Sequence, residues 1–142
     1  PRPVPAFQLM NADEEIWDIS QRRGQVVYLN FWADFCDACK QELPSLAEFA
    51  VQFLDAGVEV VIIAIDDDPG IPEAYLEQTF GDTLPFTSLF DPGGQVAAQF
   101  GTVAVPETYI IQESGFILAR FVGEQPFMSS AHLRLAALLV ED

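Results

Sequence analysis

The sequence predicts an α/β sandwich in which helices cover a mixed β-sheet. Residues 26–32 and 58–65 are nearly continuous apolar runs, which are typical of central strands buried on both faces. Residues 37–56, between them, carry apolar side chains at three- and four-residue spacing, as an amphipathic helix does. A strand, a helix and a strand at this spacing form a βαβ unit with parallel strands and a right-handed crossover.

Shorter elements are expected elsewhere in the chain. They are a helix at residues 72–80, an extended segment at 85–91, a helix at 95–100, two hairpin-connected strands at 108–112 and 116–122, and a last helix from Ser129 or Ser130 to Val140. Within the first helix, Pro44 is expected to cause a kink without ending it, because the apolar period continues past it. Gly57 is expected to end that helix as its C′ residue.

The composition limits the classes of function. The 142 residues suit a single domain, and 22 acidic against 6 basic residues give a net charge of −16. Phosphate backbones and anionic lipid headgroups repel such a chain, so nucleic-acid binding is excluded. The sequence has no apolar run of eighteen residues, which argues against direct insertion into a membrane.

Two cysteines, Cys36 and Cys39, stand where the first predicted strand gives way to the first predicted helix. The helix N-terminus stabilises a thiolate on Cys36, and the thiolate is the species that attacks a disulfide. Cys39, one turn further in, is expected to be more buried and to attack the mixed disulfide that Cys36 forms. A Cys-x-x-Cys beside a βαβ unit therefore predicts redox activity.

Other interpretations of the two cysteines are weaker. A zinc site needs about four ligands, whereas the chain offers two cysteines and the distant His132, so no metal site is predicted. A purely structural disulfide here would close a loop of four residues, which is worth about 2 kcal/mol against about 4.7 kcal/mol for a long loop.

Three segments resemble a known family. They are NFWADFCDACKQELP at residues 30–44, AFQL at 6–9 and VPETYI at 105–110. Together they are similar to the thioredoxin superfamily, and within it to the TlpA/ResA/DsbE-type thiol reductases.

The resemblance implies the fold in more detail. It implies one domain over residues 1–142, a thioredoxin-like three-layer α/β/α sandwich with a mixed central sheet. An N-terminal β extension is expected at residues 1–24 and a central helix/strand insert at 64–102. It also implies a redox-active Cys36–Cys39 disulfide and no further cofactor.

The resemblance also implies roles for residues around the cysteines. The bond between Val105 and Pro106 is expected to be cis and to face the disulfide, with the Val105 backbone pairing with an extended substrate. Phe35 and Trp32 are expected to contact the substrate as well. By itself, Pro106 would be interpreted as an ordinary proline at the start of a strand, but its separation from the Cys-x-x-Cys favours the cis interpretation.

Glu42 matches a glutamate that follows the second cysteine by three residues in ResA-like proteins. It lies on the same helix face as Cys39, where a partly buried carboxyl group has a raised pKa and exchanges protons with the thiol. The alternative is a solvated glutamate on the helix surface.

The sequence departs from the family at four positions. Phe35 replaces the usual tryptophan and keeps only its aromatic cover, and Ala38 replaces a frequent proline. Asp34 and Asp37 add negative charge that raises the pKa of Cys36 and offsets part of the helix effect. These charges favour a reductant over a strong oxidant.

The leading hypothesis is a protein-disulfide reductase, with apocytochrome c as a substrate by analogy. An upstream thiol electron donor and a monomeric state are also expected. Alternatives are a copper-delivery module, a non-catalytic adaptor and a peroxidase, although the Pro-x-x-x-Thr-x-x-Cys pattern of peroxidases does not precede Cys36. The resemblance implies the bacterial periplasm or another extracytoplasmic space. No leader is visible at residues 1–5, so a cytosolic chain and one that has lost a leader or anchor both stay open.

Overall fold

The computed structural model describes residues 2–141. Its strands are β1 (Arg2–Pro3), β2 (Gln8–Met10), β3 (Ile16–Asp18), β4 (Val26–Trp32), β5 (Val58–Ala64), β6 (Thr87–Phe90), β7 (Glu107–Ile111) and β8 (Phe116–Val122). Its helices are the 3₁₀ helix η1 (Ile19–Arg22), α1 (Asp37–Phe53), α2 (Gly70–Phe80), α3 (Gln95–Phe100) and α4 (Ser130–Leu139). Residues 1 and 142, which the expected domain includes, lie outside the described part of the chain.

One eight-stranded mixed sheet forms the middle of the molecule, in the order β1-β8-β7-β4-β5-β6-β2-β3. Strands β4, β5 and β6 are parallel neighbours, and β7 and β8 join them antiparallel. All seven residues of β4 are buried, which explains its uninterrupted apolar sequence. The predicted strand at residues 26–32 is thus confirmed, and the one at 58–65 ends a residue earlier than expected.

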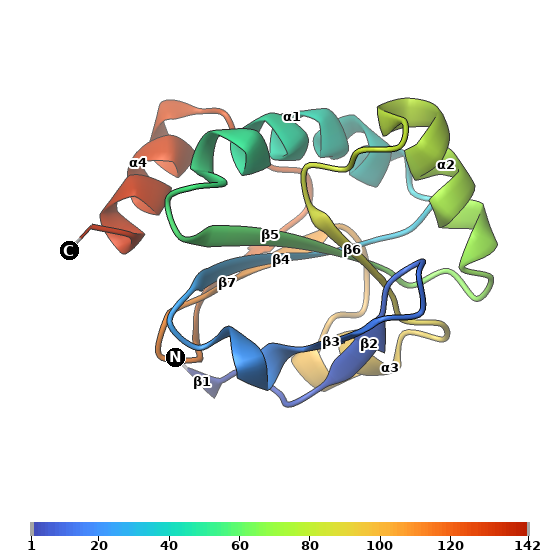
Figure 1. Cartoon of the computed structure of the whole chain (residues 1–142), viewed down its shortest axis with the longest axis horizontal. Coiled ribbons are helices and arrows are strands. Elements are labelled where there is room, and N and C mark those ends of the chain that lie inside the picture. The colour runs from blue at the N-terminus through green and yellow to red at the C-terminus, as the bar shows by residue number, and fades with distance from the viewer. Residues whose placement is uncertain (1, 142) are drawn as a thin grey trace.

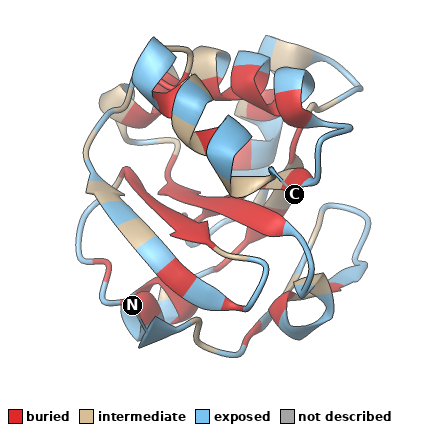
Figure 2. Cartoon of the chain, turned by 90° about the vertical axis from the view of Figure 1, so that its left-hand side faces the viewer, coloured by how far each residue is buried: buried red, intermediate tan, exposed pale blue. Residues whose placement is uncertain are grey.

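Helices cover both faces of this sheet. In Figure 1, α1 and α4 lie above the strands and α3 lies below them. Figure 2 shows the buried residues gathered on the central strands and on the inward faces of the helices. The three-layer α/β/α architecture predicted from the sequence is therefore confirmed. No helix within residues 2–141 has the length and apolar character needed to cross a membrane.

Helix α1 continues through Pro44 but ends at Phe53, three residues before the predicted end. The last turn tightens, because the amides of Leu54 and Ala56 donate to carbonyls only three residues back, at 3.4 and 3.0 Å. Gly57 is consequently not the C′ residue of the helix. It supplies a φ of 92° in the turn that leads into β5, a conformation that glycine adopts at little cost.

The N-terminal β extension is divided between the two edges of the sheet. Strand β1 pairs with β8 at one edge, whereas β2 and β3 form a hairpin that joins β6 at the other. Between β1 and β2 the chain crosses the face of the sheet that α3 covers. There the centre of the buried Phe7 ring lies 5.8 Å from the ring centres of both Trp17 and Phe100. The sequence predicted the extension but not this division.

Candidate active site

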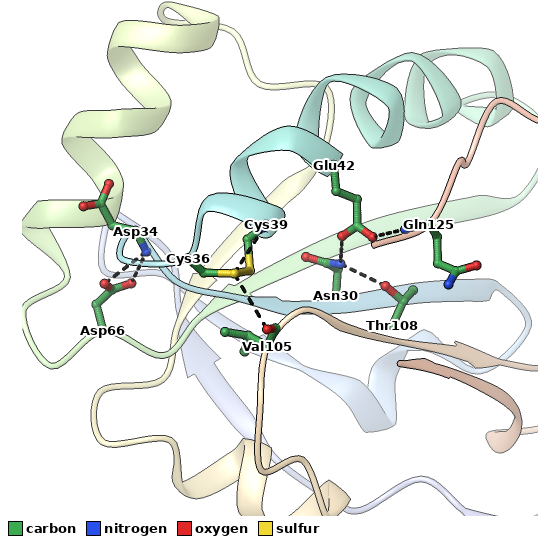
Figure 3. Close-up of a disulfide and its surroundings, with 9 residues drawn as sticks. All are labelled: Asn30, Asp34, Cys36, Cys39, Glu42, Asp66, Val105, Thr108 and Gln125. Atoms are coloured by element: carbon green, nitrogen blue, oxygen red, sulfur yellow. Dashed lines mark hydrogen bonds between the residues drawn. A yellow bond between two sulfur atoms is a disulfide. The ribbon is translucent and has the colours of Figure 1, made fainter. Parts of the chain in front are cut away.

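The disulfide between Cys36 and Cys39 lies where β4 gives way to α1 (Figure 3). Cys36 is the N-cap residue of α1, and its Sγ accepts a hydrogen bond from the Cys39 amide at 3.1 Å. Cys36 is half-buried, whereas Cys39 has no exposed surface. An incoming disulfide therefore reaches Cys36 first, which is the order expected for a nucleophile and a resolving thiol.

The segment with Val105 and Pro106 faces this disulfide. The Val105–Pro106 peptide bond is cis, as predicted, and the Val105 carbonyl oxygen lies 3.7 Å from the Sγ of Cys36. Pro106 is buried, and its carbonyl accepts the Gly123 amide at 2.9 Å. The backbone of Val105 thus lies next to the more exposed of the two sulfurs.

The two aromatic residues expected to contact the substrate differ in position. Phe35 is 74% exposed and lines a pocket of about 270 Å³ with Asp66 and Gly93, so it is available to a partner. Trp32 has no exposed surface, and its ring lies 6.0 Å from that of Tyr75 in the core. The expected substrate contact through Trp32 is therefore wrong, because Trp32 is the last residue of a strand that is buried throughout.

The charges around Cys36 are partly paired. The side chain of Asp34 lies 3.1 Å from the Lys40 ammonium group, which also lies 4.4 Å from the centre of the Tyr75 ring. The Asp34 amide donates to both carboxylate oxygens of Asp66 at 3.1 Å, and burial raises the pKa of Asp66. Asp37 has no ion-pair partner within residues 2–141. Of the two carboxylates expected to act on Cys36, only Asp37 keeps its charge uncompensated.

The carboxyl group of Glu42 is buried on the α1 side of the sheet, not solvated. One oxygen accepts from the Asn30 side-chain amide and the other from the Gln125 backbone amide, both at 2.8 Å (Figure 3). The Asn30 amide also donates to the Thr108 hydroxyl at 2.9 Å. Burial is the main cause that raises the pKa of Glu42 to about 7, and the nearby Glu124 adds to it.

A second buried carboxylate, Glu107, directly follows the cis-proline. The Arg120 guanidinium donates to both carboxylate oxygens, from Nε to Oε1 at 2.8 Å and from Nη2 to Oε2 at 3.0 Å. The Thr102 hydroxyl lies 3.3 Å from Glu107 and 2.8 Å from the Tyr109 hydroxyl. Because Thr102 belongs to the loop that carries Val105, this cluster fastens that loop to strands β7 and β8.

Reasoning from the sequence missed these partners. Asn30 did carry a signal, since it is an amide side chain inside an apolar strand, and such a group needs buried hydrogen-bond partners. Gln125 carried none, because it follows Glu42 by 83 residues in an irregular segment.

His132 lies against Phe121 and Phe127, and residues 2–141 contain no group of three His, Cys, Asp or Glu that could hold a metal ion.

Thioredoxin-like thiol–disulfide oxidoreductases combine a dithiol at a helix N-terminus with a cis-proline beside it, and the chain is a protein of this class. Comparisons with known proteins give the family. Residues 2–120 match the model of the AhpC/TSA family, and the chain belongs to this family.

Individual relatives bear the same kind of name. The thiol-disulfide oxidoreductase ResA of Bacillus thuringiensis is 25% identical over 122 residues, which cover 86% of this chain and 69% of ResA. The thiol:disulfide interchange protein HelX of Rhodobacter capsulatus is 30% identical over 123 residues, covering 84% and 66%. A crystal structure from Chlorobium tepidum, assigned as the thiol:disulfide interchange protein DsbE, is similar with a TM-score of 0.88 and 28% identity, covering 99% and 96%. The resemblance to ResA- and DsbE-type proteins is confirmed.

The raised pKa of Glu42 predicts a pH-dependent stability. The folded-state pKa of about 7 lies above the ordinary value of 4.5, so the stability that protonated Glu42 contributes is complete below pH 4.5 and is lost as the pH rises through 7. A Glu42→Gln variant does not ionise there. Between pH 4.5 and 8 we expect the parent to lose about 3 kcal/mol of unfolding free energy that the variant retains. The comparison is made by urea unfolding of the two oxidised proteins. Glu48 lies on the exposed face of the same helix, so the unfolding free energy of Glu48→Gln should change with pH as that of the parent does. The same pH dependence in Glu42→Gln would contradict the prediction.

The hydroxyl of Tyr109 predicts a contrast with that of Tyr28. Both tyrosines are fully buried, but Tyr109 bonds Thr102 and the Phe100 carbonyl, whereas the Tyr28 hydroxyl has no partner within residues 2–141. Tyr109→Phe should cost about 1 kcal/mol in free energy of unfolding, because it removes the buried hydrogen bonds to Thr102 and the Phe100 carbonyl. Tyr28→Phe should be neutral or stabilising. Equal losses in the two variants would show that the Thr102 cluster adds no stability.

Proposed function

We propose that the chain reduces disulfide bonds of partner proteins, with Cys36 as the nucleophile and Cys39 as the resolving thiol. The observation that carries this proposal is the unequal burial of the two sulfurs beside the Val105 carbonyl. A partner disulfide has access to Cys36. Cys39 is buried, and its sulfur lies at bonding distance from that of Cys36.

The reaction consists of two thiol–disulfide exchanges. The Cys36 thiolate attacks one sulfur of the partner disulfide, a mixed disulfide forms, and the other partner sulfur leaves as a thiolate. Cys39 then loses its proton and attacks the Sγ of Cys36, which releases the second partner thiolate and forms the Cys36–Cys39 disulfide. Two electrons pass to the partner, and an upstream thiol donor returns them to the chain.

Glu42 exchanges the proton of Cys39 in this scheme. Three residues apart on α1, the two side chains share one helix face. Cys39 has no exposed surface, so its proton needs a buried acceptor, and a carboxyl group with a pKa of about 7 suits that task near neutral pH. The sulfurs then carry the electrons and no further cofactor takes part.

The partners and the location complete the proposal. Substrates are disulfide-bearing proteins, and the resemblance to TlpA/ResA/DsbE-type reductases supports apocytochrome c among them. The same resemblance supports an extracytoplasmic location and a monomeric state. The only two cysteines form one disulfide, so the chain has no spare thiol that would mispair in an oxidising compartment.

Trapping tests the proposed reaction. With Cys39→Ala, the mixed disulfide on Cys36 has no resolving thiol, and we expect it to accumulate with partner proteins that mass spectrometry identifies after capture from the native compartment. Cys36→Ser should capture nothing and should lose reduction of a model disulfide. If Cys39→Ala also captures nothing, an adaptor or delivery function replaces the reductase. If Cys36→Ser retains reduction of the model disulfide, Cys36 is not the nucleophile.

The direction of electron flow is tested by the acidity of Cys36. Because Asp37 lies uncompensated in the first turn of α1, it opposes the helix effect on a thiolate. We expect the pKa of Cys36 in the reduced protein to exceed about 5, the region of strong oxidants, when it is followed by thiolate absorbance. A lower value would indicate an oxidant. Asp37→Asn should lower the pKa of Cys36, and Asp82→Asn, in an exposed turn after α2, serves as its control.

A further inference from the structure

We propose that His132 and Gln125 form a latch that positions the carboxyl group of Glu42. His132 belongs to α4, and Gln125 to the irregular connection between β8 and α4. The inference deepens the proposed function and rests on the role given there to Glu42. Neither residue touches the disulfide, so both are positioning residues and not catalytic ones.

The first part of the latch is the bond from the connection to Glu42. The Gln125 backbone amide donates to one Glu42 oxygen at 2.8 Å, while the Asn30 side chain, from β4, donates to the other. Figure 3 shows Gln125 and Asn30 on two sides of the same carboxyl group. The orientation of that group therefore depends on where the connection holds Gln125.

The second part fixes Gln125 itself. Its side-chain Oε1 lies 3.1 Å from the Nε2 of His132. The His132 ring is 6% exposed and lies between Phe121 and Phe127, with ring centres 5.0 and 5.1 Å away. A ring held by two aromatic neighbours is a rigid anchor, so its bond to Gln125 transmits that rigidity to the connection.

The protonation of His132 agrees with this arrangement. Its Nδ1 is buried and has no hydrogen-bond partner within residues 2–141, and burial lowers its pKa. The ring is then neutral near pH 7 and donates its Nε2 proton to Gln125. Phe121, Phe127 and Gln125, which contact the ring, carry no charge that would hold a second proton.

Loss of the latch has a predictable effect on Glu42. The connection supplies one of the two hydrogen-bond donors to its buried carboxyl group, so a loosened connection weakens this bond and gives water access to the group. Lost burial lowers the pKa of Glu42, whereas the lost bond raises it. Burial is the larger of the two causes, so the pKa should fall toward 4.5. The charged groups that act on Glu42 stay the same, because Glu124 is retained.

Two variants and a control test the latch in the full chain. His132→Phe keeps the ring between Phe121 and Phe127 but removes the bond to Gln125, and Gln125→Ala removes the same bond from the other side. We expect each to lower the pKa of Glu42 by about one pH unit, followed by carbon NMR of labelled glutamate carboxyl groups in the oxidised protein. The double variant should lower it no further, since both changes break one bond. Leu139→Ala, on the half-buried side of α4, should leave the titration unchanged even where it reduces stability.

The outcomes separate the latch from the proposed function. An unchanged Glu42 titration in Gln125→Ala and His132→Phe overturns the latch, and Gln125→Ala alone decides if His132→Phe does not fold. The rate at which Cys39 resolves the mixed disulfide is measured against pH in the same variants and in Glu42→Gln. If Glu42→Gln leaves this pH profile as in the parent, the proton role of Glu42 fails, while the titrations still decide whether the latch exists. If the role holds, the profile shifts with the titration in both latch variants.

Discussion

The placement of β4 between β5 and β7 is the constraint on which the site depends. Its seven residues are buried, and it is hydrogen-bonded along both edges, so its position and register have no freedom. At its carboxyl end the chain has to leave the sheet and turn into α1, and this turn sets Cys36 at the helix N-terminus. The same strand holds Asn30, whose amide binds both Glu42 and Thr108. One buried strand therefore positions the sulfur and the carboxyl group together.

The two buried carboxyl groups, Glu107 of β7 and Glu42 of α1, lie on opposite faces of the sheet in different surroundings. Successive side chains of a strand point to opposite faces, so Glu107 lies on the α3 side with Tyr109 and Arg120, and Thr108 on the α1 side with Glu42. Glu107 pairs with a guanidinium, which offsets the cost of burying its charge. Within residues 2–141, Glu42 receives hydrogen bonds from two neutral amides and no ion pair from a cation. Burial without a cation raises the pKa of Glu42 to about 7, whereas Glu107 holds the Val105 loop through Arg120 and Thr102.

The sequence predicted what depends on local pattern and missed what depends on distant contacts. Apolar runs and helical periods predicted the central strands to within one residue and the helices to within three, and the Cys-x-x-Cys was visible as a motif. Asn30 meets Thr108 across 78 residues and Glu42 meets Gln125 across 83, and no local period encodes such pairs. The substrate role expected for Trp32 failed for a related reason. A motif shows that an aromatic residue stands near the cysteines, but only the packed sheet shows which way its ring points.

The burial of Cys39 explains why a raised pKa at Glu42 matters for exchange. A free thiol has a pKa of about 8.5, so transfer of its proton to an ordinary glutamate at 4.5 would cost about 5 kcal/mol. Transfer to a group at about 7 costs about 2 kcal/mol, since each pH unit corresponds to about 1.4 kcal/mol. Desolvation of Glu42 therefore removes more than half of the pKa difference between the thiol and the carboxyl group. Within residues 2–141, no cation pairs with the carboxylate and holds it in its charged form. In the proposed scheme, the small remaining difference lets the proton return when the disulfide is reduced, so the same pair would serve both directions of the cycle.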